Sequence, residues 1–92
     1  MGIIERIKNR EVDEMDLMEF ITDNDIDIAI AAAESDIATE PILDIAAHDK
    51  DREVRMAAVN NKNTGMKTLQ YLLKDSDREI ARLAEERLVG GK

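Results

Sequence analysis

Cysteine is absent from this chain of 92 residues, and aromatic residues are scarce, with one Phe, one Tyr and no Trp. Without Cys the chain can form no disulfide, no thiolate metal site and no cysteine nucleophile. It has a single Pro and no cluster of strand-forming residues, which disfavours a β-rich fold. The apolar residues are mainly Ala, Ile and Leu, which suits closely spaced helices with thin side chains between them.

Long apolar segments are also missing. No run approaches the roughly 18 to 20 apolar residues that span a bilayer. Charges at Glu5 and Arg6 make the N-terminus a poor secretory signal, and Arg6 stands where a myristoylation motif prefers Ser or Thr. We therefore expect a soluble, cytoplasmic protein with no membrane partner.

Positive charge is missing from one contiguous third of the chain. Residues 11–44 contain twelve Asp or Glu and no Lys or Arg, in a protein of net charge −8. A nucleic-acid-binding protein shows the opposite, a basic face that displaces counterions from phosphates. The charge pattern therefore predicts no nucleic-acid partner and favours a protein partner with a basic face.

The sequence repeats itself every 26 residues without a slip in register. Four sets of identical residues follow this period: Asp23, Asp49 and Asp75; Asp25, Asp51 and Asp77; Leu17, Leu43 and Leu69; and Ala32, Ala58 and Ala84. A fixed period of roughly 20 to 50 residues is typical of solenoids, whose units bury their apolar faces by stacking on one another. The sequence therefore predicts an all-α solenoid.

Each repeat divides into two helical segments. In the best-defined repeat, helices are expected over residues 52–59 and 66–74, with Leu69, Leu72 and Leu73 on the buried face of the second. The Asn-rich segment between them favours turns and caps. Thr64, and Thr39 in the preceding repeat, are expected to cap the second helices.

The whole chain is expected to form one domain of about seven short helices, or about three and a half repeats. Its parts are a half repeat over residues 1–22, full repeats over 23–48 and 49–74, and a C-terminal capping helix over 75–90. The capping helix has Arg82 and Glu85 where the earlier repeats have apolar residues. Such polar residues are expected where the end of a solenoid faces water.

The repeat at residues 49–74 contains Asp-x-Asp-x-Glu-Val-Arg-x-Ala-Ala-Val-x-Asn, followed by Thr-x-x-x-x-Leu-x-x-Leu-Leu. This pattern resembles the leucine-rich repeat variant family and is similar to the broader HEAT-like class, over about residues 13–88. The resemblance implies a right-handed superhelix in which a regular α-helix alternates with a shorter or 3₁₀-like helix. It also implies an interaction scaffold. A relative in that family carries an iron–sulfur cluster in a cysteine-rich segment, which this chain without Cys cannot share.

The segment Asp23-Asn24-Asp25-Ile26-Asp27 has the spacing of a calcium-binding loop, with Glu34 in the twelfth position. Such a loop needs Gly in its sixth position, where this chain has Ile28. The same acids recur in every repeat, so we interpret them as helix N-caps, and expect no metal and no cofactor.

Catalytic groups are few. His48 is the sole histidine, and one His without a Ser or Cys nucleophile makes no catalytic triad. Carboxylate pairs are abundant in so acidic a chain, which makes any one pair a weak sign of acid–base catalysis. We therefore expect no enzyme activity.

The acidic segment 11–44 is the best candidate for function, with a solvated face that aids solubility as the alternative. The partner-binding residues expected are Glu11, Asp13, Glu14, Asp16, Glu19, Asp23, Asp27, Asp36, Glu40 and Asp44, and the segment also includes Asp25 and Glu34. Four methionines could line an adaptable groove or fill the core: Met15, Met18, Met56 and Met66.

The expected function is a non-catalytic protein-interaction module that presents an acidic surface. Two alternatives stay open. The first is a metal-dependent enzyme or enzyme subunit that uses acidic residues. The second is nucleic-acid binding through basic residues of the C-terminal half, namely Lys62, Lys67, Lys74, Arg78 and Arg82.

Overall fold

The computed structural model describes residues 2–90, and this part of the chain forms seven α-helices and no strand. The helices are α1 (Ile3–Lys8), α2 (Glu14–Phe20), α3 (Ile26–Glu34), α4 (Glu40–Ala47), α5 (Arg52–Asn60), α6 (Met66–Leu72) and α7 (Arg78–Val89). The expected all-helical fold of seven short helices is confirmed. None of these helices has the length and hydropathy that crossing a membrane requires.

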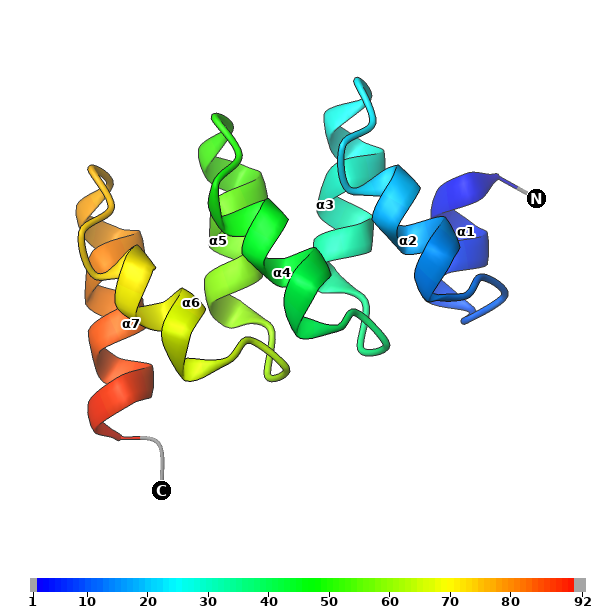
Figure 1. Cartoon of the computed structure of the whole chain (residues 1–92). Helices are drawn as coiled ribbons and strands as arrows, with labels where there is room; N and C mark the ends of the chain where they lie inside the picture. Colours follow the sequence, from blue (N-terminus) through cyan, green and yellow to red (C-terminus); the bar gives the residue numbers. More distant parts are fainter. Residues whose placement is uncertain (1, 91–92) are drawn as a thin grey trace.

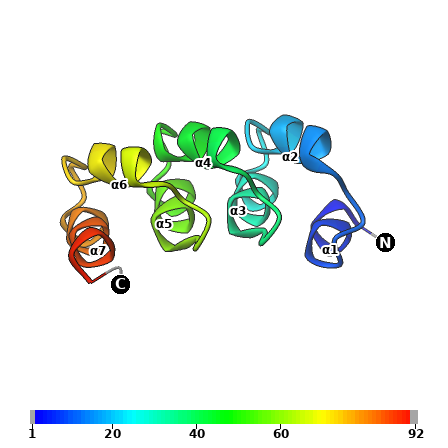
Figure 2. The same cartoon turned by 60° about the horizontal axis from the view of Figure 1, so that its bottom comes forward.

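The helices lie in two layers (Figures 1 and 2). One layer contains α1, α3, α5 and α7, and the other contains α2, α4 and α6. Within the first layer each helix contacts the next one along, α1 with α3, α3 with α5 and α5 with α7. The molecule measures 39 × 26 × 17 Å, with α1 and α7 at opposite ends.

Three helices of the first layer begin in the same way. Asp25, Asp51 and Asp77 are the N-caps of α3, α5 and α7, and each accepts a hydrogen bond from the backbone N–H two residues later. Another Asp two residues before each cap accepts from the backbone N–H of that cap. The N-cap interpretation is therefore confirmed for Asp25, Asp51 and Asp77, whereas the Asp residues two positions earlier hold the cap residues.

The threonines expected to cap the second helices act differently. Thr39 is the N-cap residue of α4, as expected, but its hydroxyl makes no cap hydrogen bond and donates instead to Glu14 at 2.6 Å. The expectation for Thr64 is wrong, because α6 begins after Gly65. The Thr64 hydroxyl is buried and donates to the carbonyl of Ala58 at 2.5 Å. Inside the protein a hydroxyl needs such an acceptor, and the end of α5 supplies it.

The core follows the repeated columns with one exception. Leu17, Leu43 and Leu69 are buried, and Ala32, Ala58 and Ala84 are fully buried where neighbouring helices approach closely. Leu73, however, is 40% exposed, so its expected place on the buried stripe is wrong. It is the C-cap residue of α6.

Candidate functional site

Some of the acids in residues 11–44 accept hydrogen bonds from backbone N–H groups at the beginnings of helices. Asp13 is the N-cap of α2 and accepts from the N–H of Asp16, whose carboxylate accepts in turn from the N–H of Asp13. Asp23 accepts from the N–H of Asp25 at 2.8 Å. These carboxylates hold backbone groups that the first helical turn leaves without partners. They are therefore structural, whatever else they contact.

Other acids join neighbouring helices of the second layer. Glu14 on α2 accepts from Thr39 next to α4. Glu40 on α4 accepts from the N–H of Gly65 at 2.6 Å and from the hydroxyl of Thr68 at 2.5 Å. Asp44 also accepts from Thr68, at 3.2 Å. The carboxylates thus stabilise the packing of α4 on α6.

Asp36 is neutralised by a base just outside the acidic segment. Arg10 donates to Asp36 through Nε at 3.1 Å and through Nη2, so the contact is bidentate. Arg10 has φ 60, the one positive φ among non-glycine residues in the described part of the chain. The pair joins the turn after α1 to the turn after α3 and reduces the negative charge there.

Four other acids of residues 11–44 make no such contacts. The side chains of Glu11, Glu19, Asp27 and Glu34 are exposed and make no hydrogen bond or ion pair within residues 2–90. Three of them belong to the expected partner-binding set. Glu34 belongs to the acidic segment but not to that set, and it is the one that lines a hollow.

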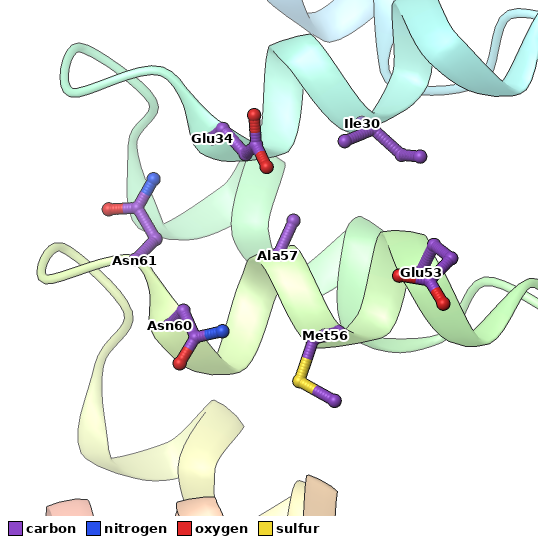
Figure 3. A pocket seen from close by; sticks show the side chains of 7 residues that line it. All are labelled: Ile30, Glu34, Glu53, Met56, Ala57, Asn60 and Asn61. Carbon is purple, nitrogen blue, oxygen red and sulfur yellow. The ribbon is translucent and has the colours of Figure 1, made fainter.

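The hollow lies between α3 and α5 and has a volume of about 170 Å³. Figure 3 shows its lining, which consists of Ile30, Glu34, Glu53, Met56, Ala57, Asn60 and Asn61. We call it the α3–α5 groove. The apolar residues of its floor come from α3 and α5, which both belong to the first layer.

The two walls run in the same direction. Ile30 on α3 lies across from Glu53 and Met56 on α5, and Glu34 lies at the end where Asn60 and Asn61 are found (Figure 3). Carboxylates therefore stand toward opposite ends of an apolar floor, one on each wall.

The amide of Asn61 is already committed to the fold. Its Nδ2 donates to the carbonyls of Ala33 and Ser35 at 2.8 and 2.9 Å, and its Oδ1 accepts from the N–H of Asn63. A ligand in the groove would find free polar groups on Glu34 and Asn60 instead.

The Glu53 end of the groove also has an excess of negative charge. Arg52 donates to Glu53 at 2.9 Å, but it also donates to Asp77 at 2.6 Å and to Glu79 at 3.3 Å. The hydrogen bond from Arg52 lowers the pKa of Asp77 to about 2, and the same contact raises the pKa of Arg52. Because the single guanidinium of Arg52 contacts three carboxylates, this cluster keeps a net negative charge.

The groove differs from the neighbouring seams of its layer in having no Lys or Arg in its lining. The hollow between α1 and α3 is lined by Lys8 and Arg10 among others. On α7, Arg82 stands in the column that holds Ile30 and Met56 in the preceding repeats. The lack of Lys and Arg on this face of the first layer is therefore confined to the α3–α5 groove.

A second pair of hollows lies on the other layer, beside a stacked pair of rings. The ring centroids of His48 and Tyr71 are 3.9 Å apart, and the angle between the ring planes is 18°. One hollow includes Glu40, Asp44 and Lys67, and the other includes Lys74. Both mix charges of opposite sign, so neither indicates one class of ligand. Nothing in the sequence pattern predicted the contact between the two rings.

The groups required by the two alternative functions are dispersed. Among residues 2–90, no three His, Asp or Glu side chains lie close enough together to hold a metal ion. The basic residues considered for nucleic acid are distributed over the turn after α5, over α6 and over α7, namely Lys62, Lys67, Lys74, Arg78 and Arg82. Arg82 is engaged with Glu86 at 2.6 Å.

No protein-family model matches this chain, and no curated protein or solved structure matches it.

Proposed function

We propose that this protein is a non-catalytic protein-interaction module that binds a basic partner through an acidic surface centred on the α3–α5 groove. The observation that carries the proposal is the lining of this groove, which combines an apolar floor with Glu34 and Glu53 and contains no Lys or Arg. An apolar floor gives contact area, and carboxylates steer a partner of opposite charge. Of the two, Glu53 contacts Arg52, and Glu34 makes no ion pair within residues 2–90.

The architecture in this proposal is a short right-handed α-solenoid of about three and a half 26-residue repeats. It is of the leucine-rich repeat variant or HEAT-like kind. The repeated columns support it, as do hydrogen bonds that recur at this spacing. Asp25, Asp51 and Asp77 cap their helices alike, and stacked repeats of this kind commonly present an extended binding face.

Short peptides rich in Lys and Arg test the proposal. We expect the native chain to bind them at low ionic strength and to release them as salt is raised, because the Debye length falls to about 3 Å at 1 M. Matched peptides rich in Asp and Glu are the control and should not bind. The measurement is fluorescence anisotropy of labelled peptides at several salt concentrations.

Two neutralised variants locate the surface. Glu34→Gln removes a charge at the groove, and Glu19→Gln removes the same charge on α2, in the other layer. Both side chains are exposed and without hydrogen bonds among the described residues, so neither change should disturb the fold. Weaker binding by Glu34→Gln alone would support the groove. If basic peptides fail to bind the native chain at low salt, the proposed function is wrong.

A further inference from the structure

We propose that the occupant of the α3–α5 groove is an amphipathic helix with two basic residues seven positions apart and an apolar residue midway between them. The inference rests on the proposed function and specifies the partner. It follows from the spacing of the groove's charges, from its volume and from the charges on either side of it.

The spacing comes from the helices themselves. Glu53 and Asn60 are seven residues apart on α5, which corresponds to about 10 Å along the helix at 1.5 Å per residue. Glu34 lies at the Asn60 end, on the opposite wall (Figure 3). The two acidic positions are therefore about two helical turns apart along the groove, which is about 10 Å by the helical rise, with Ile30 and Met56 near its Glu53 end.

A helix is the conformation that matches this pattern. Residues i, i+3 or i+4, and i+7 lie on one face of a helix, and the first and last are about 10.5 Å apart. In an extended strand, residues about 10 Å apart are three positions apart and point to opposite faces. A polyproline helix covers about 9 Å in three residues but offers no residue midway on the same face.

The volume sets what enters the groove. A hollow of about 170 Å³ admits an apolar side chain and leaves the backbone of the partner outside. The floor beneath that side chain is Ala57, which is buried, and the adaptable thioether of Met56 stands beside it. The basic side chains would then extend along the groove toward Glu34 and Glu53.

The two ends are not equivalent. Glu34 is the last residue of α3, where the helix dipole adds negative potential. Its side chain makes no ion pair within residues 2–90, although it also lines the hollow that contains Lys8 and Arg10. Glu53 is in the first turn of α5, where the dipole is positive, and it already contacts Arg52. The Glu34 end should therefore contribute more to the binding of a cation.

The neighbouring cations confine the partner to one seam. Lys8 and Arg10 line the hollow on the α1 side, and Arg82 occupies the corresponding apolar position on the α7 side. Arg10 pairs with Asp36 and Arg82 pairs with Glu86, which lowers the negative charge that a basic helix meets in either direction, so we infer a stoichiometry of one partner helix per chain.

Two peptides of identical composition test this inference. One has two Lys residues seven apart with Leu midway, in a helix-favouring background, and the other has the same residues permuted to break this spacing. We expect the spaced peptide to bind about tenfold more tightly, which corresponds to about 1.4 kcal/mol. It should also gain helical circular dichroism on binding. Labelled peptides are titrated with the native chain at low salt.

Variants of the chain complete the test. Glu34→Gln should weaken binding of the spaced peptide about two- to fivefold, the range for an exposed charge pair, and Glu19→Gln should leave it unchanged. Met56→Lys, which introduces a cation as Arg82 does on α7, should abolish the preference for the spaced peptide. Circular dichroism of each variant verifies that its helices form.

The outcomes are distinct. If both peptides bind equally and Glu34→Gln weakens both while Glu19→Gln weakens neither, the helical occupant is wrong while the acidic interaction surface at the groove stands. If neither peptide binds, both proposals fail together.

Discussion

Arg87 and Asn61, which are 26 residues apart, hold the ends of successive helices in the same way. The amide of Asn61 donates to the carbonyls of Ala33 and Ser35 at 2.8 and 2.9 Å. The guanidinium of Arg87 donates to the carbonyls of Val59 and Asn61, both at 2.7 Å. The acceptors of Arg87, Val59 and Asn61, come 26 residues after the acceptors of Asn61, Ala33 and Ser35. The side chain has changed between repeats, and the two donated hydrogen bonds have been retained.

Replacing Asn61 by Ala should destabilise the protein by about 1 to 3 kcal/mol. The substitution removes two donated hydrogen bonds at a buried side chain, to the carbonyls of Ala33 and Ser35, of which Ser35 keeps the N–H of Ala38 as a donor. Asn60→Ala is the matched control, because Asn60 is the adjacent amide, is exposed and makes no side-chain hydrogen bond in the described part of the chain. Urea unfolding followed by circular dichroism measures both. Equal losses would mean that the amide of Asn61 contributes nothing particular.

The buried leucine column gives a second prediction. Leu43→Ala and Leu69→Ala should each cost about 2 to 5 kcal/mol, the usual range for truncating a buried Leu. Leu73→Ala should cost clearly less, because Leu73 is 40% exposed. Denaturant unfolding of the three variants makes the comparison. A loss at Leu73 as large as that at Leu43 would contradict the assignment of the core.

The helices could be predicted from the sequence because local chemistry determines them. Capping Asp residues mark where α3, α5 and α7 begin, and the spacing of Leu and Ala marks the buried faces. Thr64 misled the prediction, since a Thr before a helix is equally able to donate to a carbonyl in the core. Propensity could not distinguish the two roles, which depend on the distance to α5.

The candidate groove was only partly visible in the sequence. The excess of acids over residues 11–44 was evident, but the partners of those acids lie elsewhere in the chain. Arg10 contacts Asp36, and Gly65 and Thr68 contact Glu40, across distances that composition does not report. Met56 was considered for a groove, but its neighbour Glu34 could be assigned to the same hollow only once α3 and α5 were placed side by side.

Asp77 gives a prediction on acid stability. Its folded-state pKa is lowered to about 2, chiefly by the hydrogen bond from Arg52. A carboxylate with a depressed pKa adds stability above its unfolded pKa, near 4, and this contribution is lost as the pH falls from about 4 to about 2. Asp77→Asn keeps a side-chain oxygen for the cap but removes the charge. Its unfolding free energy should therefore depend less on pH in this window.

The control for Asp77→Asn is Glu19→Gln, which also removes one carboxylate but at an exposed side chain without hydrogen bonds within residues 2–90. Thermal unfolding between pH 2 and about 5 compares the variants with the native chain. The same pH dependence in Asp77→Asn and the native chain would show that the contact with Arg52 does not stabilise the folded state.

The last prediction concerns Ile26, which occupies in the preceding repeat the position that Arg52 occupies in the next one. Arg52 donates to Asp77 and Glu79, and the residues 26 positions before these acceptors are Asp51 and Glu53. Ile26 is 37% exposed, so a longer side chain has room. Ile26→Arg should place a guanidinium beside Asp51 and stabilise the protein by about 0.2 to 1 kcal/mol relative to Ile26→Gln. The gain should shrink as salt is added.

The same substitution should weaken binding in the α3–α5 groove, because it introduces a cation near Glu53, at a groove whose lining contains no Lys or Arg. Stability is measured by thermal unfolding, and binding by titration with a Lys-rich peptide, with Ile26→Gln as the reference for both. If Ile26→Arg is more stable but binds less, then Ile26 keeps the groove negative at a cost in stability. If Arg and Gln at this position have equal stability and bind equally, the two repeats are not equivalent at this column, and the groove does not depend on its lack of cations.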